Sequence, residues 1–232
     1  MTPRPTEGVE PPTLTEPLED CLREIYKLEL ADGHATNGAL ADRLTLVPSS
    51  ATAMVKRLAA LGLVEHAPYR GATLTDDGRR AALALVRRHR LLERYLTDAL
   101  GVDLAVVHNE ADRLEHRLSP ALQERIADVL GHPERDPHGD PIPDRHLGTP
   151  SEPDGPDRSI ASLDAGDRAA VQRIPDDDPR LVGYLSERGL VPGAQIEVIE
   201  RAPYEGPVTL RLADTEIAIS RQLAEAILIS SP

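Results

Sequence analysis

The chain has 232 residues, a hydrophobic fraction of 40%, a formal net charge of −13 and a single cysteine. One cysteine excludes an intramolecular disulfide framework and fits a reducing compartment, so we expect a cytoplasmic protein. No apolar run approaches the roughly 18 residues of a membrane-spanning helix, and no leader-like segment follows Met1, so we expect neither membrane insertion nor secretion.

The charge is unevenly distributed along the chain. Between His34 and Arg94 there are ten Lys or Arg residues and five Asp or Glu residues, so a basic segment lies within an acidic protein. Such a local balance is compatible with a nucleic-acid-binding module, although it is not specific to one.

The first predicted element is a helix that follows a polar N-terminus. Residues 1–14 are rich in Pro, Thr and Glu, and we expect them to be disordered. Thr15 is a good N-cap, Pro17 suits a first helical turn, and Asp32-Gly33 marks the helix end.

A helix-turn-helix and a β-ribbon come next, over 37–44, 49–61 and 63–74. This order predicts a winged-helix domain over 15–75, and the alternative is a three-helix packing unit without a DNA role. Small residues at the start of the second helix would let the backbone approach the major groove. The predicted DNA contacts are Ser49, Ser50, Thr52, Lys56, Arg57 and Arg70.

The middle of the chain is predicted to be a helical domain over 76–143. A long helix should run from Thr75-Asp76 to about Leu100, followed by helices over 108–118 and 121–130. Their wide apolar faces have no sheet to cover them, so they predict a homodimer interface.

Carboxylates and histidines recur at helical spacing in this domain. Asp112, Glu115 and His116 share one face at i, i+3 and i+4, and His89 and Glu93 are one turn apart. Each residue alone is compatible with a solvated surface, but together they indicate a cation site. Oxygen and imidazole donors without thiolates suit Mn²⁺, Fe²⁺, Co²⁺, Ni²⁺ or Zn²⁺, with Mn²⁺ favoured.

The remaining histidines lack an acidic partner at helical spacing, and we expect them at the surface. They are His34, His66, His132, His138 and His146. Cys21 is expected to be a small buried residue. No phosphate-binding glycine loop or activated nucleophile is present, which disfavours an enzyme, although ligand types alone leave a metal-dependent hydrolase open.

The C-terminal part is predicted to be a small β-barrel. Residues 144–158 are rich in Pro, Gly and Asp and should form a linker. Within 159–232 the pattern alternates with period two, over about five short strands, with a helix inserted over 179–188. The whole chain is therefore assigned to the α+β class.

Several motifs together make the chain similar to the diphtheria-toxin-repressor and manganese-transport-regulator family of metal-dependent repressors. They are Leu74-Thr75-Asp76-Asp77-Gly78, Arg88-His89-Arg90-Leu91-Leu92-Glu93, Glu115-His116 and Asp136-Pro137-His138-Gly139-Asp140-Pro141-Ile142-Pro143. The resemblance implies a winged helix, a helical metal-binding and dimerisation domain and an SH3-like, or FeoA-like, domain. It also implies a homodimer that binds operator DNA and represses metal-uptake genes.

The resemblance also implies two metal sites. The primary, regulatory site would comprise Asp20, Asp112, Glu115 and His116. The ancillary site would comprise His89, Glu93 and His108, with an acidic ligand from the SH3-like domain, for which Asp178 is the best match. Leu181 stands where iron-type members have an amide ligand.

The resemblance favours manganese over iron. Iron-type members have Met and Cys where this chain has Asp20 and Asp112, whereas manganese-type members have Asp and Glu. We therefore expect Mn²⁺, with Fe²⁺ as the alternative and Co²⁺, Ni²⁺, Zn²⁺ or Cd²⁺ as possible substitutes. Arg23 replaces the Glu that completes a binuclear centre in some members, so two separated sites are expected. A winged-helix DNA binder without any metal stays open as a further alternative.

Overall fold

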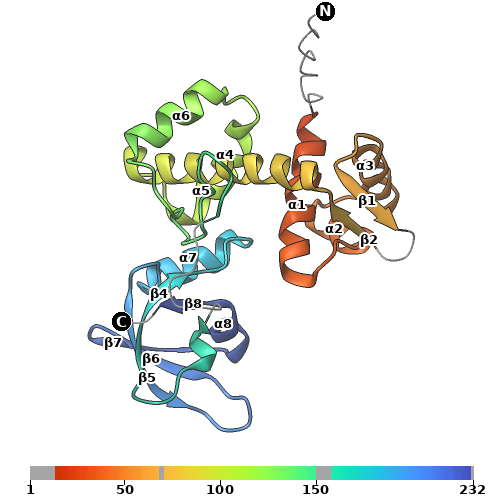
Figure 1. Cartoon of the computed structure of the whole chain (residues 1–232). Coiled ribbons are helices and arrows are strands. Elements are labelled where there is room, and N and C mark those ends of the chain that lie inside the picture. Colours follow the sequence, from red (N-terminus) through yellow and green to blue (C-terminus); the bar gives the residue numbers. More distant parts are fainter. Residues whose placement is uncertain (1–13, 68–70, 150–157, 231–232) are drawn as a thin grey trace, which may run out of the picture. The chain divides into compact units, whose positions relative to one another are not determined.

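Helix α1 (Glu16–Asp32) is the first element that the computed structural model describes (Figure 1). The described residues are 14–67, 71–149 and 158–230, so Arg70, nearly all of the predicted disordered N-terminus and most of the predicted linker lie outside them. Pro17 occupies the first turn of α1, and Gly33 ends it in the left-handed conformation with φ of 76°. Both helix ends therefore fall where the sequence predicts them.

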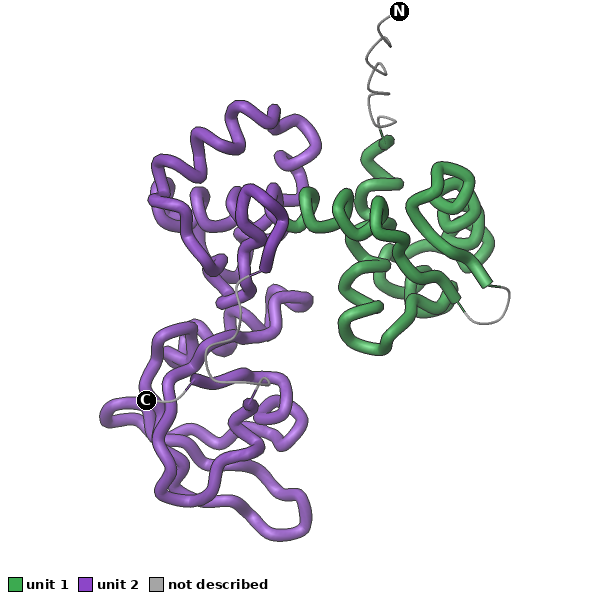
Figure 2. Tube along the Cα trace, in the orientation of Figure 1, with its two compact units in different colours: residues 1–86 green, residues 87–232 purple. Residues whose placement is uncertain are grey.

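The chain divides into two units, Met1–Val86 and Arg87–Pro232 (Figure 2). The first unit contains α1, α2 (Asn37–Arg43), α3 (Pro48–Ala60), β1 (Val64–Ala67), β2 (Gly71–Leu74) and the start of α4 (Asp76–Leu100). β1 and β2 form an antiparallel ribbon. This is the predicted order of a winged helix-turn-helix.

Helix α3 is held in place by one apolar face. Ala51, Val55 and Leu58 recur at steps of four and three residues, and all three are buried. They share a core with Leu22 and Ile25 of α1. The polar positions between them are left on the outer face, as expected for an amphipathic helix on a small core.

The second unit begins with a helical part. It contains the rest of α4, α5 (Leu104–Glu115) and α6 (Pro120–Val129). Helix α5 starts earlier than the predicted 108–118, because the Asp103 side chain accepts the N–H of Ala105 and caps it. Leu91, Val107 and Ala111 belong to its core. No helix in the described ranges is both long enough and apolar enough to cross a bilayer.

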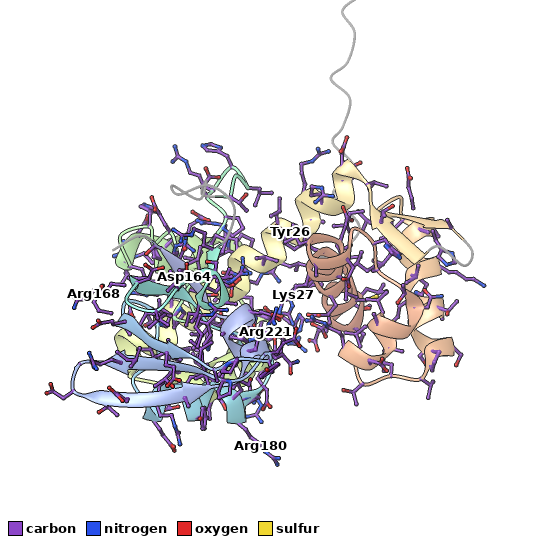
Figure 3. All side chains as sticks on the ribbon, turned by 90° about the horizontal axis from the view of Figure 1, so that it is seen from below. Tyr26, Lys27, Asp164, Arg168, Arg180 and Arg221 are labelled. Carbon is purple, nitrogen blue, oxygen red and sulfur yellow. The ribbon has the colours of Figure 1, made fainter. Side chains whose placement is uncertain are left out.

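The rest of the second unit is a six-stranded antiparallel sheet with the order β3-β8-β4-β5-β6-β7. Its elements are β3 (Arg158–Ser159), a 3-10 turn (Ile160–Ser162), β4 (Arg168–Arg173), α7 (Pro179–Glu187), β5 (Gln195–Arg201), β6 (Val208–Leu212), β7 (Thr215–Ile219), α8 (Arg221–Ala226) and β8 (Leu228–Ser230). Arg168 and Arg180 project outward from it (Figure 3). The first and last strands along the chain in this part, β3 and β8, have only two and three residues, which is too short for a period-two pattern to predict them.

The helical part and the sheet contact each other through residues 136–140. Gly139 has φ of 96°, and a Cβ there would lie 1.9 Å from the carbonyl oxygen of Gln172. The N–H of Ile174 donates to the carbonyl of His138 at 3.0 Å. Only glycine allows this close approach, so the motif packs directly on the end of β4.

Candidate metal centre and DNA-binding surface

His89 on α4 is only 4% exposed and has polar groups on both ring nitrogens. Its Nε2 lies 3.0 Å from Glu93 Oε1 and 3.1 Å from His108 Nδ1. Its Nδ1 lies 2.9 Å from Glu115 Oε2 and 3.4 Å from Asp112 Oδ1. The ring therefore contacts residues from both sets that the sequence assigned to separate sites.

These side chains meet because each helix presents them on one face. His89 and Glu93 are one turn apart on α4. His108, Asp112 and Glu115 follow each other at steps of four and three residues on α5. His108 Nδ1 lies 2.9 Å from Glu93 Oε1, which closes the group across the two helices. We call these five residues the His89 cluster.

Glu93 is fully buried but remains a carboxylate. Burial alone would raise its pKa, but the facing His89 and the hydrogen bonds with His108 and His89 hold the pKa well below its usual range. A buried carboxylate between two imidazoles is a suitable donor set for a divalent cation.

A second group of buried donors lies beside the His89 cluster. Glu93, Asp136 and His138 each offer one ligand atom, and these atoms lie within 4.8 Å of one another. Glu93 Oε2, Asp136 Oδ2 and His138 Nδ1 are buried without a hydrogen-bond partner. We call these three residues the buried triad, and buried oxygen and nitrogen donors of this kind fit a cation that would be coordinated there.

His138 was predicted to lie at the surface, and this prediction was wrong. His138 is 0% exposed, because its ring contacts the Leu104 carbonyl at 3.1 Å and its backbone packs on β4. Asp136 was not predicted to be a metal ligand. Both lie in a Pro- and Gly-rich stretch, where a search for helical spacing has no pattern to detect.

Asp136 has an environment that disfavours its ionised form. Burial raises its pKa well above the usual range, the neighbouring Glu93 and Asp140 raise it further, and Arg90 opposes the shift. Crowded buried carboxyl groups require a proton or a cation for compensation.

The sheet domain contributes Asp176 rather than Asp178 to this region. Asp176 Oδ2 lies 3.9 Å from His108 Nδ1. Asp178 is the N-cap of α7, and its Oδ1 accepts the N–H of Arg180 at 2.9 Å. Leu181 packs against the core of the sheet. Asp176, Asp177 and Asp178 form an aspartate run in the sequence, and its first member is the one that lies beside the histidines.

The remaining predicted ligands belong to both units. His116 follows α5 as its C-cap, and its Nε2 lies 3.7 Å from Glu115 Oε1. Asp20 lies on α1 in the first unit, so its participation with the second-unit ligands stays a prediction. Cys21, next to it, is buried as predicted, and burial raises the pKa of its thiol to about 12. A protonated, enclosed thiol is a poor metal ligand.

The outer face of α3 carries most of the predicted DNA contacts. Ser49, Ser50, Lys56 and Arg57 are exposed there. Thr52 is half-buried, and its hydroxyl donates to the Pro48 carbonyl at 2.8 Å and accepts from Asn37 at 3.0 Å. That hydroxyl therefore also fastens α3 to α2. Arg70 lies outside the described residues.

Three family models match the chain in order. They are the iron dependent repressor N-terminal DNA binding domain over residues 13–72, the iron dependent repressor metal binding and dimerisation domain over 75–144, and the FeoA domain over 158–231. The diphtheria toxin repressor of Corynebacterium efficiens is 33% identical, over 92% of this chain and 95% of its own length. The chain belongs to the diphtheria-toxin-repressor and manganese-transport-regulator family.

Other members of the family span the same architecture. The iron-dependent repressor IdeR of Mycobacterium tuberculosis is 32% identical, over 92% of this chain and 96% of its own length. A solved structure of a manganese-dependent transcriptional repressor in complex with manganese is 36% identical, with a TM-score of 0.83 over 93% of this chain and 100% of that chain. The match to this solved structure confirms the predicted α+β architecture. The relatives are metal-dependent transcriptional repressors, which excludes the hydrolase alternative.

The dimerisation domain of this repressor carries an apolar groove of about 460 Å³. Its lining residues come from the second half of α4, the end of α5, the turn that follows α5, and α6: Leu92, Tyr95, Leu96, Leu100, Leu114, Arg117, Leu118, Leu122, Arg125, Ile126 and Val129. Leu100, Leu122 and Val129 are each at least half exposed. Large apolar side chains gathered on one open surface indicate a protein–protein interface.

Proposed function

We propose that this repressor is activated by Mn²⁺, binds its operator as a homodimer in the cytoplasm and controls metal-uptake genes. The donor chemistry of the His89 cluster carries the proposal. Its ligand atoms are carboxylate oxygens and imidazole nitrogens, and Cys21 has a buried thiol whose pKa is raised to about 12. Oxygen-rich sets without sulfur suit Mn²⁺ better than softer ions.

The cluster supports two neighbouring metal positions. In the first, Asp112, Glu115 and His89 would bind the ion together with His116, and Asp20 would join them from the first unit. In the second, Glu93 would bind with His89, His108 and Asp176, and Asp136 and His138 would complete it. This assignment uses Asp176 in place of Asp178, because the Asp178 carboxylate caps α7.

Activation would follow from the ligand that comes from α1. A metal ion bound by both Asp20 and α5 would restrain the DNA-binding unit, and so favour the spacing of two recognition helices that fits successive major grooves. The ion would also offset carboxylate charge in a chain with a net charge of −13 that must approach phosphates.

The apolar groove would be the contact surface between the two copies of the chain. Its exposed leucines and valine come from α4, α5 and α6, all within the domain matched by the metal binding and dimerisation model. Covering these side chains removes apolar surface from water and stabilises the pair.

A metal titration of DNA binding tests the proposal. A duplex selected from a random library with Mn²⁺ serves as the probe, and anisotropy is followed against buffered free Mn²⁺, Zn²⁺ and, without oxygen, Fe²⁺. We expect Mn²⁺ to activate binding and Asp112→Ala to abolish the response. Glu110→Ala is the matched control, because it removes another carboxylate of α5 that pairs with Arg113 at 2.8 Å. Activation by Fe²⁺ at much lower free concentration would overturn the manganese assignment.

Fe²⁺ is the second candidate, because several relatives are named iron-dependent repressors. The sulfur-for-oxygen variant Asp20→Met with Asp112→Cys separates the two. If oxygen donors select Mn²⁺, this variant responds less to Mn²⁺ and more to Fe²⁺ and Cd²⁺. An unchanged order of metal response would remove the donor-atom argument.

A further inference from the structure

Arg23 is an arginine with an unusual degree of burial. It lies on α1 and is only 7% exposed, whereas arginine is rarely buried unless it is paired. Its Nη2 lies 3.8 Å from Asp20 Oδ1, and its Nε lies 4.0 Å from Glu24 Oε1. A fixed positive charge therefore lies beside the carboxylate that α1 would offer to a metal ion.

Neutralising Glu24 does not explain the position of this charge. Glu24 also lies 3.8 Å from Lys27 Nζ and 3.6 Å from Arg43 Nη1, so two other cations serve it. What Arg23 adds is a guanidinium within ion-pair distance of Asp20.

We infer that Arg23 sets the metal concentration at which the repressor responds, by opposing the binding of a divalent cation to Asp20. The inference rests on the proposed function, because it requires Asp20 as a metal ligand. Two positive charges around one carboxylate repel each other, and the burial of Arg23 strengthens the repulsion by lowering the effective dielectric constant around its guanidinium. The penalty depends on the charge of the ion and not on its identity, so Arg23 governs affinity while the donor atoms govern selectivity.

A positioning role for Arg23 would change the metal affinity in the opposite direction. If Arg23 instead held Asp20 in the conformation that binds metal, its removal would weaken binding. The direction in which metal affinity changes therefore distinguishes competition from positioning. A measurement of protein stability would not distinguish these two roles.

The test measures metal affinity of the full chain for Mn²⁺, Co²⁺ and Cd²⁺ by competition with a fluorescent chelator. We expect Arg23→Gln to bind each ion at least about fivefold more tightly, by a similar factor for all three. Arg23→Lys retains the charge and should stay near the wild type. Arg80→Gln is the matched control, because it removes one charge from another i, i+3 ion pair, with Asp77, in the same unit.

Arg23→Met replaces Arg23→Gln if the latter does not fold. Equal or weaker affinity in these neutral variants, or a gain confined to one metal, overturns the inference. Asp20→Ala distinguishes this failure from failure of the proposed function. If Asp20→Ala binds Mn²⁺ like the wild type, the α1 ligand itself is wrong. If Asp20→Ala weakens binding while Arg23→Gln does not tighten it, only the role of Arg23 is wrong.

Discussion

Glu29, near the end of α1, accepts the backbone N–H of Leu74 at the end of β2, with 2.8 Å between Oε2 and the nitrogen. Its other oxygen, Oε1, pairs with Arg79 on α4. One side chain therefore connects the helix that carries Asp20 to the wing and to the start of α4. A restraint on α1 would reach the β1–β2 ribbon, which is the wing of the winged helix, through this carboxylate.

Replacement of Glu29 tests that connection. Glu29→Ala leaves the Leu74 N–H without its acceptor, so we expect the free energy of unfolding to fall by about 1–3 kcal/mol. DNA affinity at saturating Mn²⁺ should fall as well, because the wing loses its support. Glu29→Gln keeps an acceptor oxygen and should retain most of the stability. Urea unfolding and DNA anisotropy measure both effects, and an unchanged Glu29→Ala protein would contradict them.

Gly139 offers a sharper test of how the motif at residues 136–140 packs on the sheet. In Gly139→Ala the new Cβ would lie 1.9 Å from the Gln172 oxygen, so we expect a loss of more than about 4 kcal/mol in unfolding free energy. Gly131→Ala is the control, because Gly131 also has a positive φ, of 72°, but has no atom within 4 Å of an added Cβ. Its cost should be about 1–2 kcal/mol, from backbone strain alone. Equal losses in urea unfolding would argue against the close packing.

The sequence predicted elements well where local chemistry determines them. Pro17 and Gly33 mark the ends of α1, and the three- and four-residue spacing of Ala51, Val55 and Leu58 predicts which face of α3 is buried. The positions of the His89 and Glu93 pair and of the α5 ligands follow from the same helical spacing. These features depend on residues that are neighbours along the chain.

The rest of the site depends on contacts between distant segments. His138 has no helical pattern around it, and it is buried where its backbone pairs with Ile174, just after β4, and its ring contacts the Leu104 carbonyl. The Asp178 carboxylate caps α7, because the helix begins directly after it, and Asp176 is the aspartate that lies beside His108. Sequence spacing could not distinguish the members of the aspartate run, because the exact start of a short helix decides between them.

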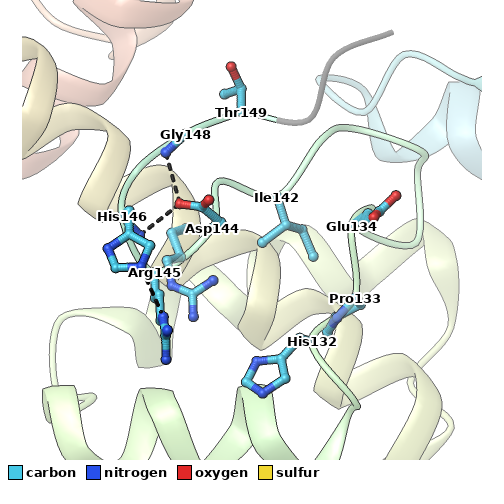
Figure 4. A pocket seen from close by; sticks show the side chains of 10 residues that line it. His132, Pro133, Glu134, Ile142, Asp144, Arg145, His146, Gly148 and Thr149 are labelled. Carbon is cyan, nitrogen blue, oxygen red and sulfur yellow. Dashed lines mark hydrogen bonds between the residues drawn. The ribbon is translucent and has the colours of Figure 1, made fainter. Parts of the chain in front are cut away.

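The pH response of the loop at 144–148 follows from Asp144 (Figure 4). Its Oδ1 accepts the N–H groups of His146 at 2.7 Å and Gly148 at 2.9 Å, and these hydrogen bonds lower its pKa. A lowered pKa contributes stability above the unperturbed value of 3.8, and this stability is lost as the pH falls through the folded-state pKa.

Amide exchange measures this response directly. Protection of the His146 and Gly148 amides should therefore decrease as the pH falls below about 4, after correction for intrinsic exchange. In Asp144→Asn the acceptor oxygen remains but cannot gain a proton, so protection should be independent of pH over that range. Protection in the wild type that does not change with pH would show that the Asp144 carboxylate does not hold the loop.

The apolar groove predicts the effect of a buried charge on assembly. Leu122 is 51% exposed in one copy, and Leu122→Glu would place a carboxylate in the proposed dimer contact. We expect light scattering to report a monomer and DNA affinity to fall at least tenfold, as about 1.4 kcal/mol or more is lost. Val106→Glu is the control, because Val106 is 46% exposed on α5 but does not line the groove. Dissociation by Val106→Glu and not by Leu122→Glu would place the dimer contact elsewhere.

His89 makes the most specific prediction about the metal centre. Its Nδ1 lies 2.9 Å from Glu115, while its Nε2 lies 3.0 Å from Glu93, so one ring contacts both proposed metal positions. We expect His89→Ala to weaken both steps of Mn²⁺ binding by at least about tenfold, measured by calorimetry with electron paramagnetic resonance of the free ion. Asp176→Asn should weaken one step only, because Asp176 lies beside His108 at 3.9 Å. If His89→Ala leaves one step intact, the ring serves a single position, and the two sites are separated as the sequence alone suggested.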